Sequence, residues 1–155
     1  MPLQGLTRRR NSQRRRTSHR RRTNNTKTQC DKTYIVQTLL KMLRTVKLHH
    51  WKTKSYSQHK ATDELYERMN EKMDRFAEVY MGKDGKRIGA WNKDMELMFG
   101  SAFSDGAFEK NVHAFREFLI NLDRCLDPKQ DSDLLSIRDD LLGDVNQFLY
   151  LYTLR

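Results

Sequence analysis

Apolar side chains recur at three- and four-residue intervals along most of this chain, and this helical periodicity is the feature that most restricts its fold. Ile35, Leu39 and Val46, for example, belong to one such stripe. No segment shows the alternation of polar and apolar residues that is typical of a half-buried strand. The sequence therefore predicts an all-α protein. The four stripes predict helices over residues 31–54, 56–81, 106–126 and 132–153.

The connections between these helices indicate how they are arranged. A short turn joins the first two, and Ser55 and Gln58 have the spacing of a capping box at the start of the second. Another short turn joins the third and fourth. Residues 82–106 form a long central connection, with a short helix expected near residues 92–99. A four-helix bundle with a long crossover in the middle is the ferritin-like arrangement, and this is the fold that we predict.

Charge divides the chain into two parts. The whole sequence of 155 residues has a formal net charge of +10. Residues 1–30 contain ten basic residues and no acidic one, whereas residues 31–155 contain basic and acidic residues in equal number. We therefore predict a basic tail over residues 1–30 and a helical bundle over residues 31–155. Like charges without apolar partners should leave the tail disordered when it is free.

The tail has the composition of a polyanion ligand. Its nine arginines form three triplets at six-residue intervals. Each guanidinium can bind a phosphate and displace condensed counterions, and nothing in the tail can read base edges. We expect DNA binding through the phosphate backbone without sequence preference, and nuclear targeting, a solvated charge run and a mitochondrial transit peptide are the competing interpretations. The residues expected to contact phosphate are Arg8, Arg9, Arg10, Arg14, Arg15, Arg16, Arg20, Arg21, Arg22 and Lys27.

The two cysteines and the hydropathy of the chain lead to two further expectations. Cys30 and Cys125 fit no metal-binding spacing, so we expect isolated thiols in a reducing compartment. No apolar run approaches the ~18 residues that a membrane span requires, so we expect no contact with a membrane.

The stretch "LHHWKTKSYSQHK", residues 48–60, concentrates histidines around the first turn. His50 and His59 lie at equal distances from that turn, so antiparallel helices can bring them face to face. Asp63 follows His59 by four residues and shares its face of the helix. These three side chains are candidate metal ligands, although solvated polar residues around a turn are the competing interpretation.

Asp74 and Glu78 form a second pair at a four-residue interval. Asp74 lies fifteen residues after His59, which corresponds to roughly 22 Å along one helix. No single ion can bind both within one chain, so a shared site requires two chains. A two-fold symmetric dimer would contain two such sites. Imidazole and carboxylate ligands suit iron, with zinc or manganese as substitutes.

These residues together resemble the motifs of a known family. The "HW" dipeptide ends the first helix, a histidine opens the second, an aspartate follows four residues later, and "DxxxE" begins fifteen residues after that histidine. This pattern resembles the Dps mini-ferritins, DNA-binding proteins from starved cells. With "IRDDLLGDVNQFLYLYTL" near the C-terminus, the chain is most similar to the short mini-ferritin-like proteins of large DNA viruses. The resemblance covers residues 31–155.

The resemblance implies an intersubunit ferroxidase site. One subunit would supply His50 and His59, and the other Asp74 and Glu78. Asp63 matches the position that helps to hold a second iron, and Trp51 matches a tryptophan beside the site. The family assembles from dimers into hollow shells, oxidises Fe(II) with peroxide or oxygen, and often binds DNA through a basic tail.

The chain departs from the family pattern at the first turn. His50 and His59 are nine residues apart rather than twelve, and the usual glycine is missing. His49 is an alternative ligand in a shifted register. The predicted function is a DNA-binding ferroxidase. A structural nucleoprotein or virion component with a degenerate metal site is the main alternative, and it would bind other virion proteins. A monomeric DNA-binding protein is a third hypothesis. The expected location is intracellular and DNA-associated, in a virion interior or in the host cytoplasm or nucleus.

Overall fold

The computed structural model of the chain describes residues 30–89 and 105–154. This part of the chain is helical and contains no strand. The four predicted helices are confirmed, except that the third is shorter and continues as a 3-10 turn. The tail and the short helix expected near residues 92–99 lie outside the described residues, apart from Cys30. The elements are α2 (Lys32–Lys52), α3 (Tyr56–Asp84), α5 (Asp105–Asn121), η1 (Leu122–Arg124) and α6 (Ser132–Tyr152).

The start of α3 follows the predicted capping box only in part. Ser55 Oγ accepts a hydrogen bond from the backbone N–H of Gln58, as predicted, at 3.4 Å. The Gln58 side chain does not return to the backbone of Ser55. Instead, the hydroxyl of Thr53 accepts from Ser55 N at 3.2 Å and donates to Gln58 Oε1 at 2.7 Å. The Thr53 hydroxyl therefore links Ser55 to Gln58 and stabilises the tight turn between α2 and α3.

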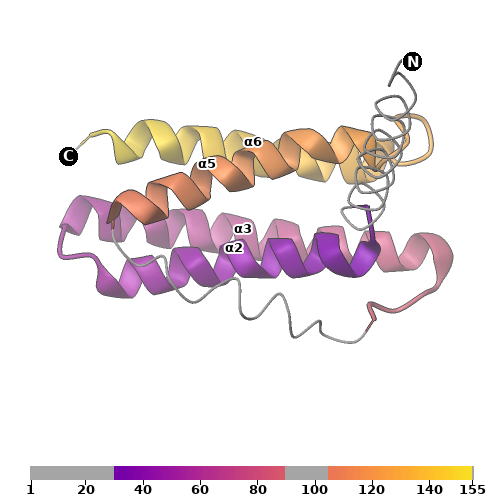
Figure 1. Cartoon of the computed structure of the whole chain (residues 1–155), viewed down its shortest axis with the longest axis horizontal. Coiled ribbons are helices and arrows are strands. Elements are labelled where there is room, and N and C mark those ends of the chain that lie inside the picture. The colour runs from indigo at the N-terminus through magenta and orange to yellow at the C-terminus, as the bar shows by residue number, and fades with distance from the viewer. Residues whose placement is uncertain (1–29, 90–104, 155) are drawn as a thin grey trace, which may run out of the picture.

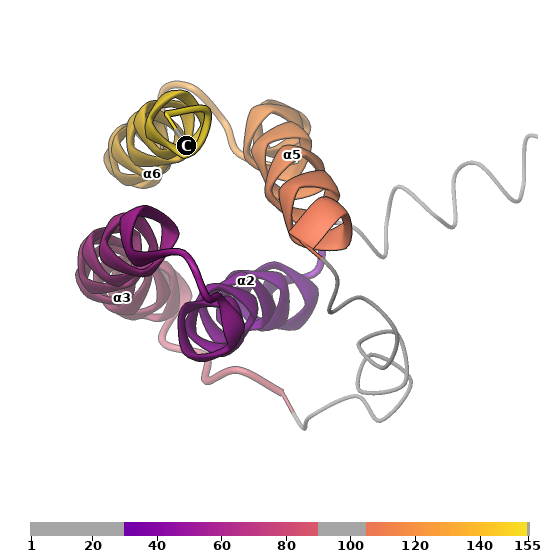
Figure 2. The same ribbon diagram turned by 90° about the vertical axis from the view of Figure 1, so that its left-hand side faces the viewer.

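The four helices form two antiparallel hairpins, α2–α3 and α5–α6, stacked on each other (Figure 1). The view along the bundle shows α3 beside α2 and α6, and α5 beside α6 (Figure 2). At one end, Lys32 at the start of α2 forms an ion pair with Asp84 at the end of α3. At the other end, His49 near the end of α2 stacks on Phe108 near the start of α5. The C-terminus of α3 and the N-terminus of α5, which residues 85–104 connect, therefore lie at opposite ends of the bundle.

Apolar side chains from all four helices fill the centre of the bundle, and the predicted stripes supply most of them. In α6, Leu134 is fully buried, whereas Leu135 is only partly buried and packs against the core. The buried residues of α6 continue from Leu134 to Ile137, Leu141 and Val145 in steps of three and four. Leu135 lies about 100° around the helix from Leu134 and falls at the edge of this arc.

The two cysteines form a disulfide, so the expectation of isolated thiols is wrong. Cys30 directly precedes the N-terminal cap of α2, and Cys125 directly follows η1. Their Cα atoms are 5.0 Å apart although 95 residues separate them in the sequence. The pairing results from the antiparallel packing of α2 on α5, which cysteine spacing alone does not reveal. The bond ties the point where the tail joins the bundle to the end of the third helix.

Candidate metal site

His50 and His59 face each other across the α2–α3 turn, as the sequence predicts. Their imidazole rings stack with centroids 3.9 Å apart and an interplanar angle of 23°. His50 is buried and His59 is partly buried. The shortened turn therefore keeps the two rings in direct contact. His49 points elsewhere: it is buried, stacks on Phe108 and lies 3.5 Å from the Tyr152 hydroxyl, so it belongs to the core.

Reciprocal hydrogen bonds fix the orientation of the two rings. His50 Nδ1 donates to the backbone carbonyl of His59 at 3.0 Å, and His59 Nδ1 donates to the carbonyl of His50 at 3.0 Å. A carbonyl oxygen can only accept, so each Nδ1 carries the hydrogen. In the neutral rings both Nε2 atoms then keep a lone pair, which is the tautomer that binds metals. The buried Thr62 hydroxyl lies 2.7 Å from the Gln58 carbonyl and 3.0 Å from the His59 carbonyl, so its one hydrogen is shared between these two acceptors.

Asp63 lies beside the histidine pair. Its Oδ1 atom is 3.7 Å from His50 Nε2, and its side chain is 37% exposed. Two ligand atoms on one tetrahedral metal ion are about 3.3 Å apart, so these two atoms are close to a ligating separation. The Lys47 ammonium lies 3.5 Å from the same carboxylate oxygen and 4.4 Å above the Tyr66 ring. Lys47 therefore supplies a positive charge where a bound cation would lie.

Asp74 and Glu78 are exposed on the same helix as His59, several turns further along. Because α3 is continuous from Tyr56 to Asp84, the axial distance of roughly 22 Å from His59 to Asp74 applies. Glu78 also lines an open cavity of about 360 Å³ together with Met81 and Arg87. Among the described residues, no three histidine, cysteine or carboxylate side chains are placed to hold one metal ion. One chain thus brings together His50, His59 and Asp63 but leaves Asp74 and Glu78 apart from them.

Trp51 is adjacent to His50 in the sequence, but its side chain is 68% exposed. Tyr56, at the start of α3, is 78% exposed. Both aromatic residues are therefore largely exposed to solvent at the α2–α3 turn. The predicted phosphate contacts, Arg8 to Arg22 and Lys27, fall outside the described residues.

Sequence reasoning missed two residues of the site, Lys47 and Thr62. Lys47 lies three residues before His50, so helical geometry places it on the same face. Thr62 lies three residues after His59 and is fully buried. Their spacing from the histidines could have indicated that they share a helix face with them. Only the structure shows that Lys47 pairs with Asp63 and that the Thr62 hydroxyl contacts the His59 carbonyl.

Comparison with known proteins leaves the activity open. The model of one family, described as a family of unknown function (DUF5856), matches residues 50–152. The matched region begins at His50 and contains all five predicted ligands, whereas the tail and Lys47 lie outside it. No curated protein and no solved structure matches the chain. Of the helices that the structure describes, none combines the length and the apolar character needed to cross a membrane.

Proposed function

The chain belongs to the family of unknown function DUF5856, and from its own residues we propose that it is an oligomeric mini-ferritin that binds nucleic acid. In this proposal Fe(II) is the substrate, and each oxidation site forms between two copies of the chain. The basic tail binds DNA phosphates without sequence preference. Oxidation of Fe(II) near DNA would remove the ion that generates damaging radicals from peroxide.

The observation that carries the proposal is the paired, oriented arrangement of His50 and His59. Two imidazoles with both Nδ1 atoms bound to carbonyls leave two Nε2 atoms as ligands. The Asp63 carboxylate lies 3.7 Å from His50 Nε2. Outer hydrogen bonds of this kind are what hold histidine ligands in place in metalloproteins. A pair of surface histidines would not require such bonds.

The missing ligands would come from a second copy. Asp74 and Glu78 are exposed, and within the described part of the chain neither side chain forms a hydrogen bond or an ion pair. A two-fold axis that places the turn of one copy against the middle of α3 in the other would complete two identical sites. Trp51, exposed beside His50, would then be covered by the partner.

The direction of the helices supports a ferritin-like connection. α2 and α3 are antiparallel, and α5 begins at the end of the bundle where α2 ends. α3 and α5 therefore run in the same direction. A bundle of this kind requires a crossover along its length between the second and third helices.

The reaction requires only that the site hold Fe(II) and admit an oxidant. Two Fe(II) ions each give one electron to hydrogen peroxide, its O–O bond breaks, and two protons complete two molecules of water. The residues of this chain would bind and orient the ions, and the partly exposed Asp63 would give solvent access beside the histidine pair. Zinc and manganese are substitutes that the same donor set would accept.

A complementation experiment tests whether the site is shared between chains. His59→Ala and Asp74→Ala should each abolish Fe(II) oxidation. After the two variants are mixed, unfolded and refolded together, half of the dimers should contain both chains, and each mixed dimer should contain one intact site. We expect about a quarter of the wild-type number of sites, counted by anaerobic Fe(II) titration and then by peroxide consumption. Activity that does not return would contradict a shared site.

A second candidate function is a structural nucleoprotein that has kept the fold and lost the metal. The position of Lys47 favours it, because an ammonium 3.5 Å from Asp63 can replace a metal ion electrostatically. Elemental analysis of the purified protein, followed by loading with Fe(II), distinguishes the two. A protein that binds DNA but cannot be loaded supports the structural function.

A further inference from the structure

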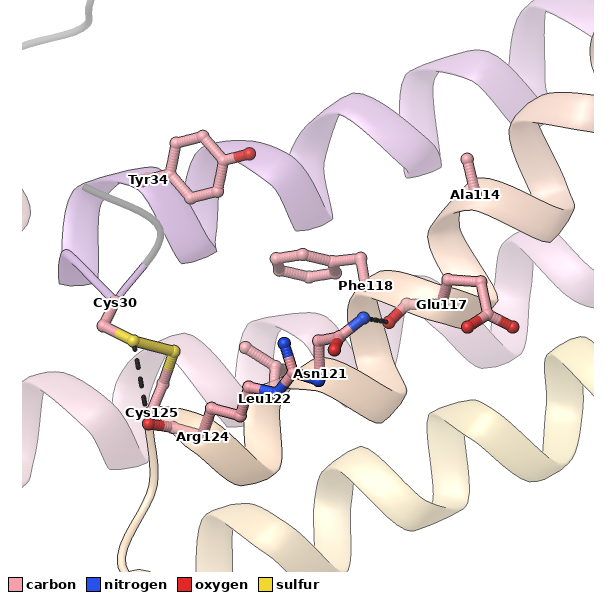
Figure 3. Close-up of a pocket in the computed structure, with 9 residues that line it drawn as sticks. All are labelled: Cys30, Tyr34, Ala114, Glu117, Phe118, Asn121, Leu122, Arg124 and Cys125. Atoms are coloured by element: carbon pink, nitrogen blue, oxygen red, sulfur yellow. Dashed lines mark hydrogen bonds between the residues drawn. A yellow bond between two sulfur atoms is a disulfide. The ribbon is translucent and has the colours of Figure 1, made fainter. Parts of the chain in front are cut away.

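The Cys30–Cys125 disulfide lies at a solvent-open cavity rather than in the closed core. The cavity has a volume of about 390 Å³ and lies between the start of α2 and the end of α5 (Figure 3). Both cysteines line it, as do Tyr34, Phe118 and Arg124. A small thiol that enters the cavity can therefore approach the sulfur atoms without disruption of the bundle.

The surroundings of the bond hold the start of α2 even without the cross-link. The Asp31 carboxylate caps the first turn by accepting from Tyr34 N at 3.2 Å. Lys32 donates to the Tyr80 carbonyl at 2.8 Å and pairs with Asp84, so this end of α2 is also held to α3. What the disulfide adds is a covalent tie to α5.

We propose that the Cys30–Cys125 bond is a thiol-exchange site for small thiols, and that its reduction in the folded protein releases the junction of tail and bundle from α5. A thiolate attacks one sulfur, forms a mixed disulfide and expels the other cysteine as a thiolate, which takes a proton from water. A second thiol attacks the mixed disulfide and leaves as a small-molecule disulfide. Two electrons thus pass from two small thiols to the protein.

We expect the positive charge of Arg124 to favour exchange, because Arg124 lines the same cavity and a nearby cation stabilises a thiolate. Cys30 is the last residue of the predicted tail, so attack at its sulfur would leave the small thiol at the junction of tail and bundle.

The rate of reduction in native buffer tests the proposal. The full chain is treated with increasing 2-mercaptoethanol, samples are quenched with iodoacetamide, and the alkylated fraction is measured by mass spectrometry while circular dichroism follows helix content. We expect a rate linear in thiol concentration, unaffected by mild urea, with helix content retained. A rate that saturates and rises steeply with urea would show that thiols reach the bond only in unfolded chains and would overturn the proposal.

Two pairs of variants test whether thiols reach the disulfide through this cavity. Ala114→Trp introduces a large side chain at the cavity wall and should slow reduction several-fold, whereas His113→Trp, at a neighbouring exposed position outside the lining, should not. Arg124→Gln should slow it about threefold, and Arg75→Gln, at an exposed position on α3, should leave it unchanged. Equal rates within both pairs would contradict entry through this cavity.

Hydrogen exchange identifies what the reduction releases. After reduction, or in a Cys30→Ser/Cys125→Ser variant, the first-turn amides of α2 should exchange faster while those in the middle of α6 stay unchanged. Unchanged protection in α2 would show that the bond holds nothing that the other contacts do not already hold, and would contradict release of the junction.

Discussion

At the level of single residues, His50 and His59 differ from ordinary histidines near a turn because each ring is bound to the backbone of the other's residue. The nine-residue spacing places each Nδ1 beside the carbonyl across the turn. This interval is therefore compatible with two oriented rings.

Lys47 should limit the affinity of this site for a cation. Replacement of Lys47 by Met keeps a long side chain and removes the ammonium beside Asp63. Because the pair is partly exposed, we expect Fe(II) to bind about two- to fivefold more tightly, the range of a surface charge interaction. Anaerobic calorimetric titration measures the change. Lys110→Met, at an exposed position on α5, is the control, and identical affinities in the two variants would contradict competition at Asp63.

At the level of elements, a set of ion pairs holds α3 against the start of α6 and the start of α2. Lys83 of α3 lies 3.2 Å from Asp131 and 3.0 Å from Asp133, and Lys32 pairs with Asp84. Hydrogen bonding to Lys83 lowers the pKa of Asp133, and hydrogen bonding to Lys32 lowers the pKa of Asp84. Both carboxylates therefore favour the folded state while they are ionised.

The contribution of these carboxylates should be lost in acid. Their folded pKa values lie below the unfolded value of 3.8, so the stabilisation is present above that pH and disappears as the pH falls through the folded values. The melting temperature should decline below about pH 4. Asp84→Asn/Asp133→Asn should flatten this decline in calorimetric scans, whereas Asp140→Asn, at an exposed position of α6, should not. A decline of equal steepness in all three proteins would assign acid sensitivity to other groups.

The presence of the four helices could be predicted from the sequence, because apolar periodicity depends only on residues that are close together in the chain. The four helices, the Ser55 cap and the facing of His50 and His59 all depend on residues close together in the chain. The disulfide and the role of Lys47 could not be predicted in the same way. Each depends on how one helix is rotated and shifted against another, and the same rotation explains why Leu134 rather than Leu135 is buried.

At the level of the whole molecule, the tail and the bundle should contribute separately to DNA binding. With about ten phosphate contacts, the slope of log affinity against log salt should approach roughly −9. Replacement of Arg20, Arg21 and Arg22 by Gln should reduce its magnitude by about 2.7, and the same change at Arg8, Arg9 and Arg10 should have an equal effect. Fluorescence anisotropy over a salt series measures both.

The control for the tail is a triple change in the bundle. Lys110→Gln/Arg116→Gln/Lys129→Gln removes three positive charges from described surface positions and should leave the slope unchanged. A reduction equal to that of the tail variants would show that the bundle itself binds the phosphates.

The cross-link at Cys30 has a consequence for where the two proposed activities take place. The predicted tail ends beside the start of α2, and the histidine pair lies near the other end of this 21-residue helix, with His50 about 27 Å along the axis from Lys32. In the proposed dimer the second copy's junction would lie nearer, because Glu78 precedes Asp84 by six residues, about 9 Å of helix, and Asp84 pairs with Lys32 at the start of α2. The copy that supplies Asp74 and Glu78 would therefore carry its tail close to the proposed oxidation site, and DNA bound there would lie within reach of the reactive products.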